Sequence, residues 1–494
     1  MSDPVVIAGG GPAGMLLACE LGLAGVDTVV LERDTEICTD ETSKAHALHA
    51  RAVEALDLRG LMEEIRNEKY PIWPMIHYAN FWLDLSEILD EEYSLLAPQA
   101  KTQRVLEDRA VELGVDVRRG HRLVGLAQDE DGVTVTVLGG DGEYTLRGSY
   151  LVGCDGAHST VRELAGFSAP AAGMSWYAVF ADFDAFETEF ESPTYPEGIV
   201  AVVPHPSGPV RMMTMEFGAE APGDDVPVTV EELRARAAHI TGQEFDTPQP
   251  RWMGRAGNVT RLAERYRVGR VLLAGDAAHV HYFGAGHGLN TSMQDAMNLG
   301  WKLAGVVHGW APGHLLDTYH KERHPVGERA CVSSQAQLAL QYPPDRVEPL
   351  REIFGELVKF PDVNKYLVRV VTDVAYPFKY LGRRRADAHP LQGRPVPHVS
   401  VETAAGPVEV ASTLHTGRGV VLDLTGGKAP FGDLSGWAGR VDVVTARPSD
   451  ELGAAVVLVR PDGFVAWADA TGDDAEGLRL AITHWFGTAE KEIA

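Results

Sequence analysis

The chain has 494 residues, 45% of them hydrophobic, so it can bury a large core and is expected to divide into about three domains. Its formal net charge of −26 argues against a surface that binds nucleic acid or an anionic membrane. We find no leader segment before the first expected strand and no apolar run long enough to span a bilayer. The four cysteines lack metal-type or redox-type spacing, which predicts free thiols in a reducing cytoplasm and no metal site.

The first thirty residues have the pattern of a strand, a glycine turn, a helix and a second strand. The apolar run VVIA is typical of a strand buried on both faces. Three glycines with the spacing G-x-G-x-x-G follow; they permit a tight turn, close approach of a pyrophosphate, and packing of helix against strand. The N-terminus of the helix offers N–H groups to phosphates. The predicted phosphate-binding residues are Gly9, Gly11, Pro12, Ala13 and Gly14.

An acidic residue closes this unit at the distance that a dinucleotide site requires. Glu32 ends the second strand, 18 positions after Gly14. Such a carboxylate accepts hydrogen bonds from the adenosine ribose. We therefore place Glu32, with its neighbour Arg33, among the predicted cofactor-binding residues.

Two later segments favour FAD over NAD. In YLVGCDGAHSTVREL an apolar strand precedes Asp155 and Gly156, with Ser159 and Arg162 following at helical spacing. LLAGDAAH repeats the arrangement with Gly275 and Asp276. An aspartate at the carboxyl end of a strand can hold a ribityl or ribose hydroxyl. The alternative for either segment alone is an acid that caps the next helix.

Together, the glycine turn, the Asp155 segment and the Gly275-Asp276 segment resemble the fingerprints of the single-component (class A) FAD-dependent aromatic hydroxylases, which have the para-hydroxybenzoate hydroxylase fold. The subgroup that tailors aromatic polyketides, such as the angucycline and anthracycline hydroxylases, is the most similar. The resemblance implies FAD as cofactor, with NADPH or NADH as a transient reductant and O2 as co-substrate. It also implies that Asp276 binds the ribityl or pyrophosphate part of FAD, and that the Asp155 segment serves both FAD and NADPH.

Two positions map onto further FAD contacts of this family. Gln99 stands where the family has an FAD-contacting glutamine. Lys44 stands where the family usually has arginine. Lysine keeps the positive charge for a phosphate contact but lacks the planar guanidinium group that can make two parallel hydrogen bonds.

The loop after His279 departs from the family pattern. Relatives usually have prolines and a glutamine where this chain has Tyr282, Phe283 and His287, which are our candidate catalytic residues by location alone. In one account they reshape the substrate pocket and the flavin C4a-hydroperoxide still forms. In the other, the Phe283 ring crowds C4a and the reaction changes. The predicted flavin-contacting residues of this loop and of the helix that follows are Gly286, Gly288, Leu289 and Asn290.

Aromatic residues in two strand-like segments are candidates for the substrate cavity. We expect residues 71–98 and 168–266 to form one antiparallel sheet over the reactive side of the flavin. A flat, polycyclic substrate would suit such a cavity. The alternative is that these rings fill the core of the sheet itself. The candidates are Trp73, Tyr78, Trp82, Trp176 and Tyr177.

The predicted fold class is α/β: a Rossmann-like FAD-binding domain (1–70, 99–167 and 267–382) with an inserted antiparallel-sheet substrate domain. A linker at 383–397 leads to a C-terminal thioredoxin-like domain at 398–494, which has no cysteines for dithiol chemistry. The predicted function is an NAD(P)H-consuming monooxygenase that hydroxylates a polycyclic aromatic polyketide. The alternatives are Baeyer–Villiger oxygen insertion, a non-oxygenating dehydration or isomerisation, and inactivation of an antibiotic. The sequence leaves monomer and homodimer equally open.

Overall fold

The computed structural model describes residues 3–39, 45, 47–86, 94–172, 176–185, 194–204, 210–220, 222–223, 226–282, 284, 286–372 and 389–490. Lys44 and Phe283, two of the predicted site residues, lie outside the described residues. In the described part of the chain, no helix is both long enough and apolar enough to cross a bilayer.

The chain is a mixed α/β protein built around a six-stranded sheet. The strand order is β20-β21-β12-β1-β2-β8, and every neighbouring pair is parallel except β20 with β21. All four residues of β1 are buried, as the apolar run in the sequence predicts for a parallel strand covered on both faces. The strands are β1 (Val5–Ala8), β2 (Thr28–Glu32), β8 (Asp116–Arg119), β12 (Tyr150–Gly153), β20 (Arg267–Val268) and β21 (Val271–Leu273).

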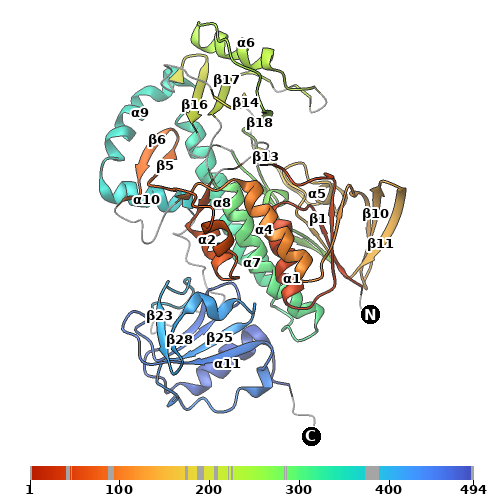
Figure 1. Cartoon of the computed structure of the whole chain (residues 1–494), viewed down its shortest axis with the longest axis vertical. Helices are drawn as coiled ribbons and strands as arrows, with labels where there is room; N and C mark the ends of the chain where they lie inside the picture. Colours follow the sequence, from red (N-terminus) through yellow and green to blue (C-terminus); the bar gives the residue numbers. More distant parts are fainter. Residues whose placement is uncertain are drawn as a thin grey trace.

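Helices pack against this sheet and against one another. The N-terminal helix α1 (Pro12–Leu23) lies between α7 (Gly288–Val307) and α4 (Gln99–Glu112) (Figure 1). This arrangement brings the glycine turn before α1 and the loop before α7 to the same end of the molecule's core. The other helices around the sheet are α2 (Ala50–Asp57), α3 (Met62–Arg66), α5 (Thr160–Leu164) and α8 (Asp317–Ala339).

A five-stranded antiparallel sheet forms a separate layer, with helix α6 (Val230–Thr241) outermost (Figure 1). Its order is β15-β16-β17-β14-β18. Alternate residues of β14 face α6 on one side and Tyr282, in the loop before α7, on the other. We call this loop, residues 281–287, the flavin loop after its predicted role. The strands are β14 (Trp176–Phe183), β15 (Thr194–Tyr195), β16 (Gly198–Pro204), β17 (Val210–Phe217) and β18 (Trp252–Gly257).

The expectation that residues 71–98 join this sheet is wrong. Strand β4 (Ile72–Trp73) pairs with β7 (Ser94–Leu95), which also pairs with β3 (Leu48–His49). Strands β5 (Met75–Tyr78) and β6 (Phe81–Asp84) form a hairpin of their own, packed against α10 (Pro361–Thr372). The apolar side chains of the hairpin pack against helices that come nearly three hundred residues later in the chain. The sequence of the segment itself contains no pattern that predicts this partner.

Two smaller sheets flank the core. One is a meander of β9 (Arg122–Gln128), β10 (Val133–Gly139) and β11 (Gly142–Gly148). The other joins β13 (Ala171–Ala172), β19 (Thr260–Leu262) and β22 (His279–Val280).

The C-terminal part is a four-stranded sheet with helix α11 (Ala475–Phe486) and a two-stranded hairpin (Figure 1). The sheet order is β26-β25-β27-β28, in which only β25 and β26 are parallel. The strands are β23 (Ser400–Thr403), β24 (Gly406–Glu409), β25 (Gly419–Asp423), β26 (Val441–Thr445), β27 (Val456–Val459) and β28 (Val465–Asp469).

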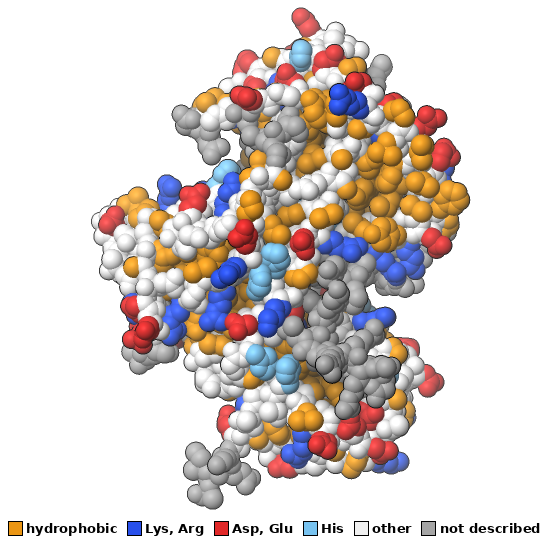
Figure 2. Space-filling view, turned by 180° about the vertical axis from the view of Figure 1, so that it is seen from behind, with side chains coloured by type: hydrophobic (Ala, Val, Ile, Leu, Met, Phe, Trp, Pro, Cys, Tyr) orange, Lys and Arg blue, Asp and Glu red, His pale blue; other side chains and the backbone are white. Residues whose placement is uncertain are grey.

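Hydrophobic side chains gather on one outer face of the molecule (Figure 2). Helix α9 (Pro344–Leu357) contributes Leu350, Ile353 and Leu357 to the exposed large hydrophobics, and Phe360 follows it.

Candidate functional site

The three glycines of the first turn meet three different environments. A Cβ added at Gly9, where φ is +107°, would lie 2.3 Å from the carbonyl oxygen of Cys154. A Cβ at Gly14 would lie 2.0 Å from the carbonyl oxygen of Gly9, because helix and turn are in direct contact. A Cβ at Gly11 would meet nothing within 4 Å. The open space beside Gly11, at the N-terminus of α1, fits an approaching pyrophosphate.

Glu32 is tied to this turn. Its Oε2 accepts a hydrogen bond from the Gly10 N–H at 2.6 Å, and its Oε1 accepts one from the Asp34 N–H at 2.8 Å. Gln103, a buried residue of α4, donates from Nε2 to the Gly10 carbonyl at 2.9 Å. The sequence analysis missed Gln103 and placed its emphasis on Gln99, which begins α4 one turn earlier. Arg33 is largely exposed and lies 3.7 Å from Asp34, without contact to the turn.

The Asp155 segment is held together from within. The carboxylate of Asp155 accepts hydrogen bonds from the Ser159 hydroxyl and from the Val161 N–H, so it supports the first turn of α5, whose N-cap is Ser159. Burial raises the pKa of Asp155, against the hydrogen bonds that lower it. Arg162 is buried and donates to the carbonyl oxygens of Ala277 and Ala157. Arg162 therefore joins this segment to the Gly275-Asp276 segment.

A buried ionic network fixes the Gly275-Asp276 turn. Asp295 accepts hydrogen bonds from the Gly275 N–H (3.0 Å), His279 Nε2 (2.6 Å) and Arg323 Nε (2.6 Å). Burial alone would raise the pKa of Asp295, but Arg323 and His279 lower it below its usual range. The sequence analysis did not give Asp295 or Arg323 a role. Each is a charged residue among the inward-facing positions of its helix, Asp295 in α7 and Arg323 in α8, and that pattern could have predicted a buried ion pair.

The flavin loop is held by Asn290. Its Oδ1 accepts a hydrogen bond from the His49 N–H at 2.7 Å, and its Nδ2 donates to the Gly286 carbonyl at 3.3 Å. Gly286 has φ of +75°, which favours glycine. A Cβ at Gly288 would lie 3.7 Å from Asp276 Oδ1, so the start of α7 adjoins the Asp276 turn. Leu289 is half-buried beside Asn290.

Three histidines crowd behind this loop, and burial favours the neutral form of two of them, His281 and His287. The His281 ring stacks on His279 at 5.6 Å between centroids and meets the His287 ring edge-on at 5.8 Å. His287 Nε2 lies 3.1 Å from the Ser333 hydroxyl, which also hydrogen-bonds Tyr78. Burial lowers the pKa of His287 to about 4 and that of His281 well below its usual value. A neutral imidazole at His287 can accept or donate a hydrogen bond at physiological pH.

Tyr282 and Trp176 meet where the loop reaches the five-stranded sheet. Their rings pack edge-on, 5.3 Å apart, and the Tyr282 hydroxyl lies 3.6 Å from the sulfur of Met215. Both side chains are buried, and burial raises the pKa of Tyr282. Trp176 Nε1 has no hydrogen-bond partner among the described residues.

Tyr177 is not part of this wall, which corrects the prediction that it shares a cavity with Trp176. Successive residues of a strand face opposite sides of a sheet. Tyr177 lies under α6, where the guanidinium of Arg236 is 4.0 Å from the centre of its ring and its hydroxyl contacts Glu232.

The three aromatic candidates of residues 71–98 lie on three successive strands, β4, β5 and β6. Tyr78 is buried and stacks on Phe354 of α9, with 5.9 Å between ring centroids. Trp73 and Trp82 are exposed. The structure thus brings only Trp176 of the five substrate candidates into contact with Tyr282. Among the described residues, no group of three or more His, Cys, Asp or Glu side chains is arranged to hold a metal ion.

Comparison with known proteins connects this geometry to a family. The model of an FAD binding domain matches residues 2–334, and that of an aromatic-ring hydroxylase C-terminal domain matches residues 389–489. This chain belongs to the FAD-dependent aromatic-ring hydroxylases. It is therefore an FAD-dependent monooxygenase by family, and the resemblance inferred from the three fingerprints is confirmed.

Individual relatives span the whole chain. The 12-dehydrotetracycline 5-monooxygenase/anhydrotetracycline 6-monooxygenase of Streptomyces rimosus is 41% identical over 99% of both chains. The dialkyldecalin synthase of Streptomyces rugosporus is 42% identical over 99% of this chain and 100% of its own. Among solved structures, CabE, an aromatic hydroxylase from angucycline biosynthesis, superposes with a TM-score of 0.90 at 38% identity, covering 99% of this chain and 100% of that one.

Proposed function

We propose that this protein hydroxylates a polycyclic aromatic polyketide, using FAD, O2 and NADPH or NADH. The observation that supports this most directly is the meeting of Tyr282 with Trp176. The flavin loop there packs on the inner face of the five-stranded sheet through two buried aromatic rings, and we expect the substrate side of the flavin to face this apolar, aromatic wall. A flat, electron-rich ring system suits such a wall. The full-length similarity to tetracycline and angucycline hydroxylases supports the same substrate class.

The proposal includes the finer domain arrangement. Residues 1–70, 99–167 and 267–382 would form the Rossmann-like FAD domain, the five-stranded sheet the substrate domain, and residues 398–494 a thioredoxin-like domain. When bound, FAD would supply the redox chemistry that couples oxidation of NAD(P)H by O2 to insertion of one oxygen atom into the substrate, with the second oxygen atom released as water. The space beside Gly11 would receive the pyrophosphate, and Asp276 would contact the ribityl chain.

The residues of the chain position and shield the reaction. The N-terminus of α7, held by Asn290, would point its N–H groups at the pyrimidine edge of the flavin and stabilise negative charge there. The Tyr282–Trp176 pair excludes water from the apolar side.

A non-oxygenating reaction is the second candidate. Tyr282 occupies the position where relatives usually have proline, and it buries a large ring against the sheet. The dialkyldecalin synthase, which is as similar to this chain as the hydroxylases are, bears a name that denotes no oxygen transfer. The same scaffold is thus compatible with binding a polyketide for another reaction.

Rapid mixing with oxygen separates the two candidates. The holoprotein, reduced anaerobically with dithionite, is mixed with oxygenated buffer with and without anhydrotetracycline as probe, and absorbance is followed through reoxidation. We expect a transient spectrum distinct from reduced and oxidised flavin, and a product 16 mass units heavier than the probe, the mass of one oxygen atom. Direct return to oxidised flavin under all conditions, with unchanged probe, would contradict the monooxygenase proposal and favour the second candidate.

A further inference from the structure

Helix α9 has two apolar faces, and the fold covers one of them. On the covered face, the ring of Phe354 stacks on Tyr78 of β5, with 5.9 Å between the ring centroids. Arg351 donates to the carbonyl oxygens of Ala79 and Leu340, at 3.1 and 2.8 Å. These contacts hold α9 against the β5–β6 hairpin and against the end of α8.

The second apolar face of α9 is open to solvent. Leu350, Ile353 and Leu357 are 52%, 61% and 43% exposed, and Phe360, which follows the helix, is 60% exposed. We call these four residues the α9 stripe. Figure 2 shows hydrophobic side chains gathered on the side of the molecule where Figure 1 places α9. An exposed apolar surface of this kind marks an interaction site on a soluble protein.

The spacing within the α9 stripe is typical of two helices that pair. Its members are separated by three, four and three positions, as are the a and d positions of a heptad repeat. With 3.6 residues per turn, such positions form one row along a helix. The row is also symmetric, because its outer members and its inner members each lie at equal distances from position 355. A symmetric row can pack against a copy of itself when the two helices are antiparallel, as a two-fold axis perpendicular to them requires.

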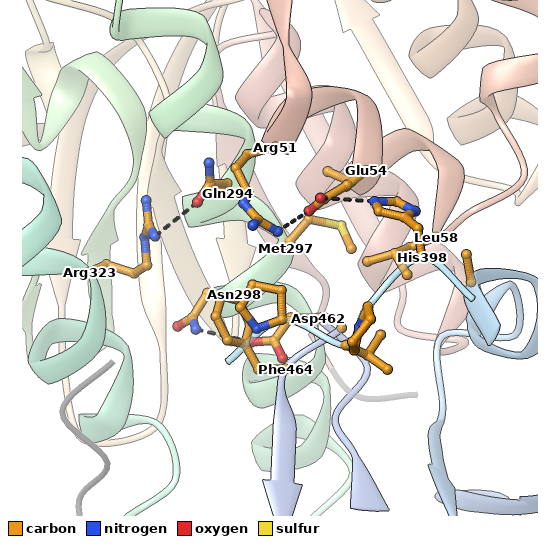
Figure 3. A pocket seen from close by; sticks show the side chains of 16 residues that line it. Arg51, Glu54, Leu58, Gln294, Met297, Asn298, Arg323, His398, Asp462 and Phe464 are labelled. Carbon is orange, nitrogen blue, oxygen red and sulfur yellow. Dashed lines mark hydrogen bonds and ion pairs between the residues drawn. The ribbon is translucent and has the colours of Figure 1, made fainter. Parts of the chain in front are cut away.

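The C-terminal domain is attached elsewhere and leaves the α9 stripe uncovered. Its loops 395–398 and 462–464 close on α2 and α7, where Glu54 contacts both Arg51 and His398 (Figure 3). The cavity that remains at this joint has a volume of about 50 Å³, which has room for a few water molecules. The joint between the domains is therefore nearly filled, whereas the α9 stripe is open.

The size of the α9 stripe suits a dimer of moderate affinity. Its four half-exposed side chains present on the order of 400 Å² of apolar surface, which is the size of a functional patch. Since about 57% of an interface is apolar, this surface corresponds to roughly 700 Å² on each partner. A stable complex buries about 800 Å² on each partner, and an obligate dimer buries more. The stripe is therefore large enough for a second copy of the chain that associates reversibly.

We propose that two copies of this chain associate through the α9 stripe, with their α9 helices antiparallel. Ile353 of each copy lies opposite Leu357 of the partner subunit, and Leu350 lies opposite Phe360 of the partner subunit. The covered face of α9 packs on the hairpin that carries Tyr78, so the dimer braces this hairpin from outside. The association does not depend on the reaction proposed above.

Sedimentation equilibrium of the purified holoprotein tests the association. The measurement is made at physiological ionic strength, where salt screens the repulsion between two chains of net charge −26. We expect a monomer–dimer equilibrium with a dissociation constant on the order of 10 µM. A monomer at every concentration up to about twenty times that value would overturn the proposal. Cosedimentation of such a monomer with phosphatidylcholine vesicles would assign the stripe to a membrane surface instead.

Charge substitutions test both the interface and its orientation. Ile353→Glu should weaken dimerisation at least about tenfold, because it places a carboxylate in the apolar interface. In the double variant Ile353→Glu/Leu357→Lys, the antiparallel arrangement sets each new carboxylate opposite a new ammonium group. The double variant should therefore dimerise more tightly than Ile353→Glu alone.

Leu480→Glu is the matched control, because Leu480 is a 64% exposed leucine on another helix, α11. It should leave the dissociation constant unchanged. All the substituted side chains are exposed, and circular dichroism checks that each variant is folded. A dimer that Ile353→Glu does not weaken, or that Leu480→Glu weakens equally, would overturn the proposal. A double variant that dimerises no better than Ile353→Glu would overturn the antiparallel arrangement.

Discussion

Gly11 and Gly14 lie three positions apart, yet a methyl group at each would meet different surroundings. At Gly14 it would collide with the Gly9 carbonyl, so glycine is needed there for folding. At Gly11 it would enter empty space, so glycine is needed there only if something else approaches. Glycine at position 14 therefore serves packing, and we propose that glycine at position 11 serves ligand access.

Alanine substitutions at these two positions should separate stability from cofactor affinity. We expect Gly14→Ala to lower the free energy of unfolding of the apoprotein by about 1–3 kcal/mol through overpacking. Gly11→Ala should leave apoprotein stability nearly unchanged and weaken FAD binding at least about tenfold, since the methyl group occupies the path of the pyrophosphate. Thermal unfolding of the apoprotein and fluorescence titration with FAD measure the two effects. Equal FAD affinity of Gly11→Ala and the parent protein would contradict the assignment.

His287 gives a pH prediction at the same scale. Because burial lowers its pKa to about 4, the unfolded chain binds a proton there more readily than the folded chain between pH 6.5 and 4. Its contribution to stability is complete above pH 6.5 and falls as the pH decreases, by about 1.4 kcal/mol per pH unit. In His287→Gln, the free energy of unfolding should therefore decrease less steeply as the pH falls from 6.5 to 4. We call this part of the pH profile the acid limb; urea titration with excess FAD measures it.

His398 serves as a control because its pKa is shifted in the opposite direction to that of His287. Its hydrogen bond to Glu54 raises its pKa, so its contribution is present at low pH and is lost as the pH rises through the raised value. His398→Gln should therefore leave the acid limb as steep as before. An acid limb equally steep in His287→Gln would show that His287 is not the group responsible.

At the scale of elements, helix α7 organises the site. Its first turn carries Asn290, its second turn carries Asp295, and these side chains fix the flavin loop and the Gly275 turn respectively. Helix α8 supplies Arg323 to the same network. One helix end thus sets the spacing between two loops that are distant in sequence from the glycine turn.

Asn290→Ala should loosen the flavin loop without unfolding the protein. The substitution leaves the His49 N–H and the Gly286 carbonyl without their side-chain partner, at a cost of about 1–3 kcal/mol. We expect FAD affinity to fall roughly tenfold or more, and cleavage by chymotrypsin, which cuts after aromatic residues and leucine, to become faster at residues 281–290. Asn364→Ala is the matched control. Asn364 of α10 also makes two hydrogen bonds to backbone: its Oδ1 accepts from the Asp84 N–H, and its Nδ2 donates to the Asp84 carbonyl, both at an exposed position. Equal effects of the two variants on FAD affinity would contradict the role of Asn290.

At the scale of the whole molecule, buried charges join the C-terminal domain to the rest. Arg460 donates to Glu322 of α8 at 2.8 and 2.9 Å and to Asp462, and Lys302 of α7 donates to Glu322 at 2.7 Å. Nearby, Arg59 bridges Glu20 and the carbonyl oxygens of the C-terminal domain. Removing one partner of such a buried pair strongly lowers the free energy of unfolding, because the remaining charge stays buried without a counter-charge or water.

Arg460→Met should uncouple the C-terminal domain. The substitution leaves Glu322 and Asp462 with too few cationic partners. We expect this to lower the free energy of unfolding by about 3–5 kcal/mol. We also expect the single unfolding transition to separate into two. Arg418→Met removes an exposed pair with Asp442 and should cost no more than about 1 kcal/mol. Differential scanning calorimetry of both variants distinguishes the cases. A single transition shifted equally in both would argue against the network as the coupling element.

The sequence by itself determined the local units whose physics is short-range. The strand–glycine–helix turn, the acid at Glu32 and the Gly275-Asp276 turn are each contained in a few consecutive residues, because backbone conformation and helix N-termini depend on near neighbours. The family and the FAD chemistry followed from the order of these units. The roles of Lys44 and Phe283, and of NAD(P)H, stay predictions.

Only the tertiary structure decided which residues share a surface. It placed Tyr177 on the α6 face of the sheet and Trp176 on the opposite face, packed the β5–β6 hairpin against α9 and α10, and joined Asp295 to His279 and Arg323. It also brought Arg51 of α2 opposite a loop of the C-terminal domain, more than three hundred residues later. Such contacts depend on the burial of whole faces of helices and sheets, and burial is a property of the assembled chain that no short window of sequence contains.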